Sequence, residues 1–312
     1  GMDLLRIALE RSASAAEEVS VITELLERHG QGGGCGHEQR DFSYHNSFLV
    51  ADRREAYVVE TAARKWAVEH VTAGVRSISN GLTIDEFAAG RSQLVRTHFS
   101  RCRTRRAITT AGAARALTVG DLMAVLRDHG TGGPAPRYSP LTGAMAAPCM
   151  HAGGLVAASQ TTASWVAELR PTGDAHWVTA TAAPCTGLFK PVRVDEPLDL
   201  GPEPTDRFDP RSLWWRHEAL HRRVLRDPAR LAPRFVPERD EVEARWQADA
   251  PPPAEAFAEA DRLLERWIDA VWADDLGPVR DTRPWWAQRY WRERDRRAGL
   301  PGAPLTRPER HP

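Results

Sequence analysis

The chain has 312 residues, with 42 basic and 42 acidic side chains, so its formal net charge is zero. This balance argues against bulk electrostatic attraction to nucleic acid or to an anionic membrane surface. Hydrophobic residues make up 42% and charged residues 27%, a mixture typical of a soluble globular protein with a sizeable core. No apolar run reaches the roughly 18 residues of a membrane span, and the N-terminus lacks the pattern of a secretory signal. We therefore expect a cytoplasmic protein.

The four cysteines, Cys35, Cys102, Cys149 and Cys185, are widely spaced. None belongs to a CxxC pair, so their spacing gives little support for zinc or iron–sulfur ligation. Four scattered thiols in a chain of this length are also unlike a disulfide framework. The sequence therefore predicts buried free thiols, with no metal and no other cofactor.

Two helices are predicted at the N-terminus, at about residues 2–10 and 14–29. Ser14 and Glu17 form a capping-box pattern before a series of apolar residues at helical spacing. Gly30 stands where a helix-ending glycine is typical, and the glycine-rich stretch that follows it indicates a loop.

Four runs rich in valine, isoleucine and aromatic residues come next, and each has the composition of a β-strand. They span residues 46–52, 55–60, 65–71 and 75–80. Short turn-like gaps separate the runs, which is typical of an antiparallel meander. Polar residues do not alternate fully along them, so we expect another layer to cover at least one face of the sheet.

Helices return between about residues 84 and 129, where Thr118 and Asp121 form a second capping-box pattern and Gly130 follows as a stop. Two further strands are predicted beyond this helical stretch, with an RPTGD turn between them. They span residues 158–169 and 174–185.

The C-terminal part is predicted to be helical after a proline- and aspartate-rich connector. Its helical segments span residues 211–227, 237–248, 254–273 and 283–297. Eight of the eleven tryptophans lie beyond residue 210, where we expect them to fill large gaps between a helical layer and the sheet. The predicted organisation is a core at 1–193, a helical part packed on it at 194–300, and a disordered tail at 301–312. Strands enclosed by helices in this order favour a layered α+β fold.

Six strings of this sequence, in this order, resemble the secernin family, whose bacterial members are called C69 dipeptidases. They are GMDLLRIALER, LLERHGQGGGCG, YHNSFLVADRREAYVVETAARKWAVEHV, GVRSISNGLTI, QTTASWVAELRP and HWVTATAAPCTGLFKPV. The resemblance covers residues 1–193 and implies an N-terminal-nucleophile hydrolase. In that fold, two antiparallel sheets pack face to face with helices outside both, which makes a four-layer αββα sandwich.

The resemblance also implies a chemistry. A cysteine at the start of the mature chain attacks the amide carbon, and its own α-amino group, of pKa about 8, acts as the base. Backbone N–H groups and an asparagine side chain stabilise the oxyanion, and no metal is needed. In the family, the nucleophile and the first strands precede the segment at which this chain begins. We therefore expect a fold that is incomplete at its N-terminus, with no nucleophile in this chain and no activity from it alone.

Asn80 and Arg105 are the predicted catalytic residues. Asn80 ends a predicted strand in the string SISNGL and resembles the oxyanion-hole asparagine of related amide hydrolases; the alternative is an asparagine that caps a turn. Arg105 resembles an arginine that related acylases place near the nucleophile, where it favours the thiolate. The alternative for Arg105 is a solvated position at the start of a helix.

Gln160, Thr161 and Thr162 are the predicted substrate-binding residues. All three fall inside a predicted strand, where buried polar side chains need hydrogen-bond partners. The resemblance makes them part of the site's support, and the alternative is ordinary hydrogen bonding between strands.

Several other residues are weaker candidates. Cleavage before Cys35 would make it N-terminal, but the family has this glycine loop in addition to its nucleophile. Cys149 and His151 have the spacing of a Cys–His dyad, but the family uses no histidine base, so a structural role is favoured. Cys185 is predicted to be a packing residue, and Lys190 is either a surface lysine or an anchor for a substrate carboxylate.

These patterns predict a cysteine-type dipeptidase or small-amide hydrolase whose nucleophile lies outside this chain. The alternative is a non-enzymatic, secernin-like protein that binds a partner while its hydrolase site stays idle. The expected partner is a dipeptide or small amide, with neither nucleic acid nor membrane, and homo-oligomerisation is left open.

Overall fold

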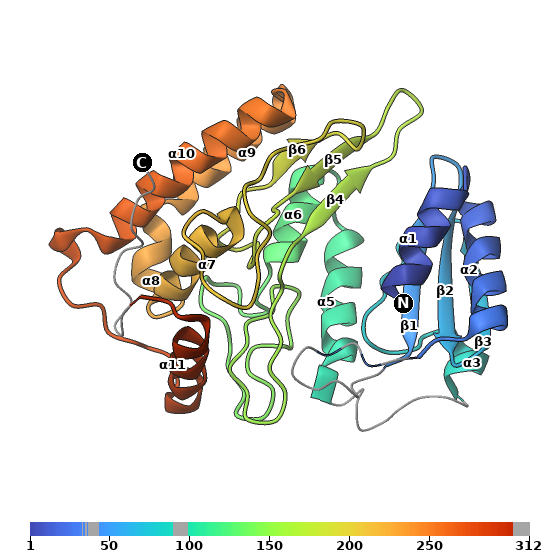
Figure 1. The fold of residues 1–312 in the computed structure, drawn as a ribbon, viewed down its shortest axis with the longest axis horizontal. Helices are drawn as coiled ribbons and strands as arrows, with labels where there is room; N and C mark the ends of the chain where they lie inside the picture. The colour runs from blue at the N-terminus through green and yellow to red at the C-terminus, as the bar shows by residue number, and fades with distance from the viewer. Residues whose placement is uncertain (33, 35, 37–43, 90–98, 302–312) are drawn as a thin grey trace. The chain divides into compact units, whose positions relative to one another are not determined.

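The computed structural model describes residues 1–32, 34, 36, 44–89 and 99–301. Contacts within the chain divide it into two compact units, Gly1–Ala114 and Arg115–Pro312. Each contains a three-stranded antiparallel sheet and several helices, so the fold is a mixed α+β fold, as predicted (Figure 1). We describe the two units one at a time.

The first unit is an antiparallel sheet with helices on it. Its elements are α1 (Met2–Arg11), α2 (Ala15–His29), β1 (Asn46–Ala51), β2 (Ala56–Ala62), β3 (Lys65–Val71), α3 (Asp85–Ala89) and α5 (Cys102–Ala113). The strand order β1-β2-β3 confirms the predicted meander over its first three strands. Ile22 of α2 packs with Phe48 and Val59 of the sheet in the core of this unit, so the expected cover on one sheet face is present.

Capping explains where the first helices begin and end. Ser14 Oγ accepts a hydrogen bond from Glu17 N, and Gly30 ends α2 with a positive φ of 74°. The Asp52 carboxylate, in the turn between β1 and β2, accepts a hydrogen bond from Ala15 N at 2.9 Å. This bond ties the start of α2 to the sheet.

The fourth predicted strand, at residues 75–80, is absent from the described sheet, which makes that prediction wrong. The segment contains one isolated bridge, between Ser79 and Gly81. The Arg76 guanidinium instead donates to the carboxylate of Glu69 on β3, at 2.8 and 3.0 Å, and to Thr83 Oγ1 at 2.6 Å. These side-chain hydrogen bonds turn the segment back at the end of β3, so it does not pair with the sheet as a fourth strand.

The second unit is a small sheet packed against a helical layer. Its elements are α6 (Val119–Arg127), β4 (Trp165–Glu168), β5 (Ala175–Val178), β6 (Lys190–Val192), α7 (Leu213–Val224), α8 (Pro228–Leu231), α9 (Val236–Ala248), α10 (Pro253–Trp272) and α11 (Trp285–Ala298), with 3₁₀ turns at Ala232–Arg234 and Asp274–Leu276. Trp177 and Phe189 from the sheet side share one core with Trp246 and Trp267 from the helices. The predicted role of the tryptophans as fillers of this layer is thereby confirmed for these residues.

The strands of this sheet differ from their predicted lengths. β4 and β5 are four residues each, much shorter than the predicted segments, and β6 was not predicted. Ala180 and Ala183, just after β5, have φ values of 52° and 50°. Left-handed backbone at these residues ends the ladder, because a strand cannot continue through it.

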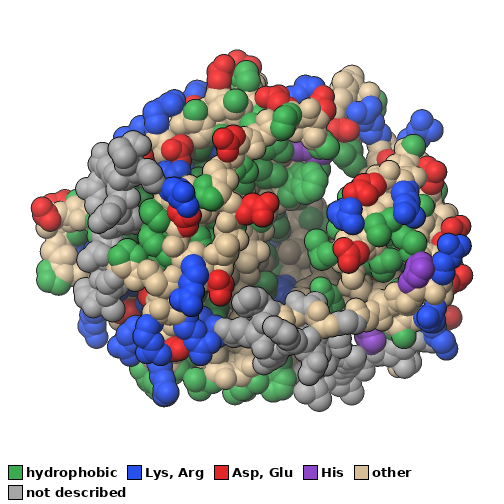
Figure 2. Space-filling view, viewed as in Figure 1, with side chains coloured by type: hydrophobic (Ala, Val, Ile, Leu, Met, Phe, Trp, Pro, Cys, Tyr) green, Lys and Arg blue, Asp and Glu red, His purple; other side chains and the backbone are tan. Residues whose placement is uncertain are grey.

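On the face drawn in Figure 2, acidic and basic side chains are interspersed, in keeping with the balanced composition. No helix in the described part of the chain is long and apolar enough to cross a bilayer. The predicted tail at 301–312 falls almost entirely outside the described residues.

Candidate functional site

Asn80 and Arg105, the two predicted catalytic residues, contact each other in the first unit. Asn80 lies exposed in the turn after β3, whereas Arg105 is buried on α5. The Arg105 guanidinium donates to Asn80 Oδ1 and, at 3.0 Å, to Ser79 Oγ. Burial lowers the pKa of Arg105, with Cys102 acting in the opposite direction, but a guanidinium remains charged at neutral pH. This contact holds the amide oxygen of Asn80 in place.

A buried carboxylate fixes the turn that follows Asn80. Glu60 on β2 is fully buried and accepts hydrogen bonds from Thr83 N at 2.6 Å, Thr83 Oγ1 at 2.6 Å and Ile84 N at 3.0 Å. Because a buried charge needs this degree of satisfaction, the turn has one strongly preferred arrangement.

A pocket of about 480 Å³ lies beside this turn among the described residues. Its wall includes Gly81, next to Asn80, and Arg106, next to Arg105. Arg103 and Asp85 also line it, so the wall carries both positive and negative side chains. This volume falls within the usual range of small-molecule sites.

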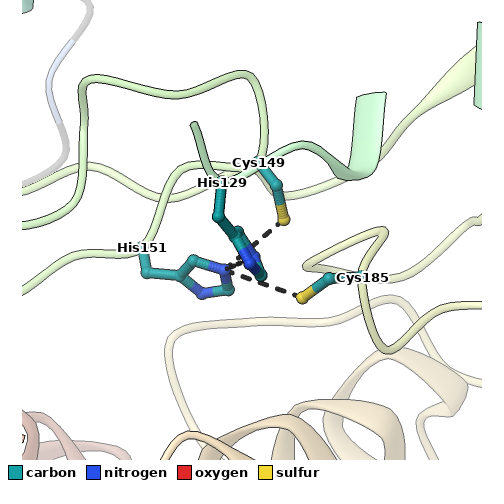
Figure 3. A group of neighbouring side chains, drawn as sticks. All are labelled: His129, Cys149, His151 and Cys185. Atoms are coloured by element: carbon teal, nitrogen blue, oxygen red, sulfur yellow. Dashed lines mark hydrogen bonds between the residues drawn. The ribbon is translucent and has the colours of Figure 1, made fainter. Parts of the chain in front are cut away.

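A second cluster, formed by His129, Cys149, His151 and Cys185, lies in the second unit (Figure 3). His129 follows α6, Cys149 and His151 lie in one loop, and Cys185 lies in the turn between β5 and β6. The four side chains point toward one another, and their ligand atoms all lie within 4.8 Å of each other. We refer to these four residues as the Cys/His cluster.

Short distances join the ring nitrogens and sulfurs of the Cys/His cluster. His151 Nε2 lies 2.9 Å from His129 Nε2, 3.4 Å from Cys149 Sγ and 3.6 Å from Cys185 Sγ. Cys149 and His151 are fully buried, His129 is 7% exposed and Cys185 is partly exposed. Two imidazoles and two thiols are the donor set of many zinc sites, so these residues could hold a metal ion.

The loop that carries Cys149 and His151 is held by Thr161. Thr161 N donates to Met150 O at 3.1 Å, Met150 N donates to Thr161 Oγ1 at 3.0 Å, and Thr161 Oγ1 donates to Pro148 O at 3.1 Å. An antiparallel bridge between Ala144 and His151 closes the loop. These bonds hold the backbone on both sides of Cys149 and His151.

Two arginines hold the turn that carries Cys185. The Arg127 guanidinium donates to Pro184 O at 2.9 Å and to Gly187 O at 3.1 Å. Arg239 donates to Cys185 O at 2.5 Å. Hydrogen bonds from side chains of α6 and α9 to three carbonyls thus hold this turn, which carries the Cys185 thiol, and none of these bonds involves another residue of the cluster.

Glu243 on α9 anchors this arrangement. Its carboxylate pairs with Arg127 through bonds of 2.5 and 2.8 Å and accepts a hydrogen bond from Phe189 N at 2.7 Å. Glu243 is 3% exposed. A bidentate ion pair of this kind fixes the relative orientation of the two side chains and also stabilises the fold.

A buried chain of charged and polar side chains extends from His151 into the helical layer. His151 Nδ1 lies 3.0 Å from His221 Nε2, and His221 Nδ1 lies 2.9 Å from Glu218 Oε2. Arg222 links Glu218, at 2.8 Å, to Asp295, at 2.7 Å. Burial raises the pKa of Glu218, but the attraction of His221 and Arg222 outweighs burial and holds that pKa well below its usual range, so Glu218 is ionised at neutral pH.

Burial and mutual contact shift the pKa values within the Cys/His cluster. Burial lowers the pKa of His151 to about 4, and burial with a hydrogen bond to Cys185 raises the pKa of Cys149. The hydrogen bond from Cys149 lowers the pKa of Cys185. Burial opposes protonation of His129, but the bond and charge of Cys185 raise its pKa overall. These shifts favour the neutral forms of His151 and Cys149 and the charged forms of Cys185 and His129.

Gln160, Thr161 and Thr162 precede β4, so their predicted place inside a strand is wrong. Gln160 Nε2 donates to Glu218 Oε1 at 3.1 Å, and Thr162 O accepts a hydrogen bond from Trp214 Nε1 at 3.1 Å. Thr161 uses its backbone and hydroxyl groups to close the Cys149 loop, which explains why it joins no ladder. Two of the three therefore support the Cys/His cluster and its buried chain, and their substrate-binding role stays a prediction.

The weaker candidates are placed as follows. Cys149 and His151 are adjacent, as the dyad spacing suggested, and Cys185 faces them rather than serving only as packing. Lys190 is 3% exposed, so the prediction of a surface lysine is wrong. Cys35 lies outside the described residues.

Sequence reasoning missed His129, His221 and Glu218. His129 lies 22 residues from His151, and His151 lies 34 from Cys185, separations that no short motif spans. One local signal was present: each cluster residue stands in a predicted loop or at the end of a predicted element, where functional side chains concentrate.

No family model matches the sequence, and no solved structure matches the fold.

Proposed function

We propose that this chain forms the body of an amide hydrolase of the secernin and C69 dipeptidase type, with a four-layer αββα core. Two helix-covered antiparallel sheets and the six resembling strings support this proposal. The observation that carries it is the contact between Asn80 and Arg105, two residues selected separately from the sequence. The attacking cysteine would belong to a segment that is not among these 312 residues.

In this proposal, Asn80 donates its amide N–H to the oxyanion that forms when a thiolate attacks the amide carbon. Arg105 acts as a positioning residue, because its guanidinium holds Asn80 Oδ1 and turns the donor group outward. Its buried positive charge would also favour a nearby thiolate over a thiol.

The pocket beside Asn80 suits a zwitterionic dipeptide. Arg103 and Arg106 would bind the terminal carboxylate, since a guanidinium matches a carboxylate in shape and charge. Asp85 would bind the terminal ammonium group. Charges of both signs in one pocket of about 480 Å³ select a short substrate with two charged ends.

Dipeptide binding to the 312-residue chain tests the pocket. Calorimetric titration with a simple dipeptide such as alanyl-alanine should give binding without turnover, and Arg106→Ala should weaken it about tenfold or more. Arg115→Ala is the matched control, since Arg115 is an exposed arginine outside the pocket. Equal affinity in wild type and Arg106→Ala, or loss of binding in the control, would remove the pocket from the proposal.

Turnover tests the assignment of Asn80. The gene should encode a cysteine upstream of Met2, and the protein made with that segment should hydrolyse dipeptides. In it, Asn80→Ala should lower kcat by about 10²–10³ with little change in KM, as loss of an oxyanion donor does. An unchanged kcat in Asn80→Ala would rule out the oxyanion role.

A further inference from the structure

The geometry points to a zinc site in the second unit, where His129 Nε2, Cys149 Sγ, His151 Nε2 and Cys185 Sγ bind one Zn²⁺ tetrahedrally. The site replaces the sequence-based expectation of a chain without a metal. It is independent of the proposed hydrolase pocket, because all four ligands belong to the second unit.

The distances from His151 Nε2 to the other three ligand atoms are close to those in a tetrahedral zinc site. Zn–N bonds of about 2.05 Å and Zn–S bonds of about 2.3 Å place two nitrogens about 3.3 Å apart and a nitrogen and a sulfur about 3.6 Å apart. His151 Nε2 lies 2.9 Å from His129 Nε2 and 3.4 and 3.6 Å from the two sulfurs. Shifts of up to about 0.4 Å would bring these three pairs to the tetrahedral values, and the remaining pairs lie within 4.8 Å of each other.

The contact between the two imidazoles is also suited to a shared cation. His151 Nε2 and His129 Nε2 face each other at 2.9 Å. Two ring nitrogens this close need either a proton or a metal ion between them, because two facing lone pairs repel. The two cysteine sulfurs lie 3.4 and 3.6 Å from His151 Nε2, so a metal ion at this point would have four donor atoms around it.

Charge balance suits a buried Zn²⁺. The ion replaces the two thiol protons, so two thiolates and two neutral imidazoles give a complex with no net charge. A neutral complex avoids the desolvation cost that an isolated buried ion would carry. Cys185 is the most exposed residue of the cluster, and the ion would reach the site from its side.

The surroundings of His151 resemble those of a metal-bound histidine. Such a histidine typically donates its other ring N–H to a carboxylate, a carbonyl or a similar acceptor, which fixes the ring and raises its basicity. Here the acceptor is His221, which is itself held by Glu218. Four protein ligands leave no open position for substrate, so the site is structural and links the end of α6, the Cys149 loop and the Cys185 turn.

Metal content and ligand chemistry test the site in the full chain. Protein purified with zinc present should contain one Zn²⁺ per chain by elemental analysis. The double variant Cys149→Ser with Cys185→Ser should contain less than about a tenth of that amount. Cys102→Ser is the matched control, because Cys102 is a buried thiol outside the cluster, and it should keep the full content.

Cobalt substitution keeps the proposal falsifiable if the double variant fails to fold. Wild-type chain loaded with Co²⁺ should show the intense visible bands of a tetrahedral ion and a thiolate-to-cobalt charge-transfer band. Chain that takes up neither Zn²⁺ nor Co²⁺, an octahedral cobalt spectrum, or unchanged zinc in the double variant would each overturn the proposal. So would a disulfide between Cys149 and Cys185, seen as a two-proton mass loss in the purified chain.

Discussion

Lys190 offers a quantitative test of the packing of the second unit. Its ammonium nitrogen is buried and donates to Thr179 O at 2.6 Å and to Leu188 O at 2.8 Å. Burial lowers the pKa of Lys190 from 10.5 to about 7, with the charge of Glu243 acting in the opposite direction. The fold therefore favours the neutral amine, and stability should depend on pH through this one group.

The direction and size of this pH dependence of stability follow from proton linkage. Between about pH 7 and pH 10.5, the unfolded state holds the Lys190 proton and the folded state does not, so unfolding takes up a proton and stability rises with pH. The slope is about 1.4 kcal/mol per pH unit, with a ceiling of about 5 kcal/mol over the whole window. Below about pH 7, both states are protonated and the dependence on Lys190 disappears.

Lys190→Met removes the titration while keeping a long side chain in the same space. The variant loses two hydrogen bonds of about 1 kcal/mol each, which shifts stability by an amount independent of pH. From pH 7.5 to 9.5, wild type should therefore gain about 2–3 kcal/mol relative to the variant. Plots of unfolding free energy against pH should therefore have different slopes for the wild type and for Lys190→Met, in addition to any constant offset.

Urea denaturation followed by tryptophan fluorescence measures this difference. Ten of the eleven tryptophans follow Ala114, so the signal reports the second unit, and groups common to both proteins cancel in the comparison. Parallel pH profiles for wild type and Lys190→Met would refute the reasoning.

Four further substitutions, one of them a control, test the local structure by chemical denaturation. Thr118→Ala should lower stability by about 1 kcal/mol through loss of a helix cap, and no change would contradict the capping role. Gly143→Ala should lower the free energy of unfolding by about 2–3 kcal/mol, because the added Cβ would lie 2.8 Å from a backbone atom. Gly132 has a similar φ but open space around it, so Gly132→Ala, the control, should cost about 1 kcal/mol. Equal losses in the two variants would argue against the close backbone approach at Gly143. Glu243→Ala should lower stability by about 3–5 kcal/mol because it leaves Arg127 unpaired, and a loss below about 1 kcal/mol would refute Glu243 as the anchor.

Local signals account for the parts of the fold that were predicted correctly. The cap at Ser14, the stop at Gly30 and the capping box at Thr118 act within four residues of the chain. The valine-rich runs of β1 to β3 are joined by short turns, so their pairing is also nearly local. Such features depend on residues close together in the sequence, so they can be predicted without knowledge of tertiary contacts.

Tertiary contacts decided the parts that were predicted incorrectly. Residues 75–80 have the composition of a strand, but the bonds from Arg76 to Glu69 and Thr83 fold them into a turn. Thr161 has strand propensity, but its hydroxyl and backbone close the Cys149 loop instead. In both places the hydrogen bonds of a polar side chain determine the backbone path.

The Cys/His cluster shows a different limit of sequence reasoning. The usual zinc signature places ligands two to four residues apart, whereas only Cys149 and His151 are close in this chain. His129 and Cys185 reach the same point because α6 ends there and two arginines fix the turn between β5 and β6. Asn80 was selected from a short motif and Arg105 from its place in the chain, and the structure brings the two into contact; their catalytic roles stay predictions.

X-ray anomalous scattering at the zinc edge, from crystals of the full chain grown with zinc, is the most direct test of the metal centre. The account predicts one peak at the Cys/His cluster, about 2.3 Å from each sulfur and about 2.05 Å from each Nε2 atom. Density without a peak, or with Cys149 Sγ and Cys185 Sγ bonded at about 2.05 Å, would contradict it.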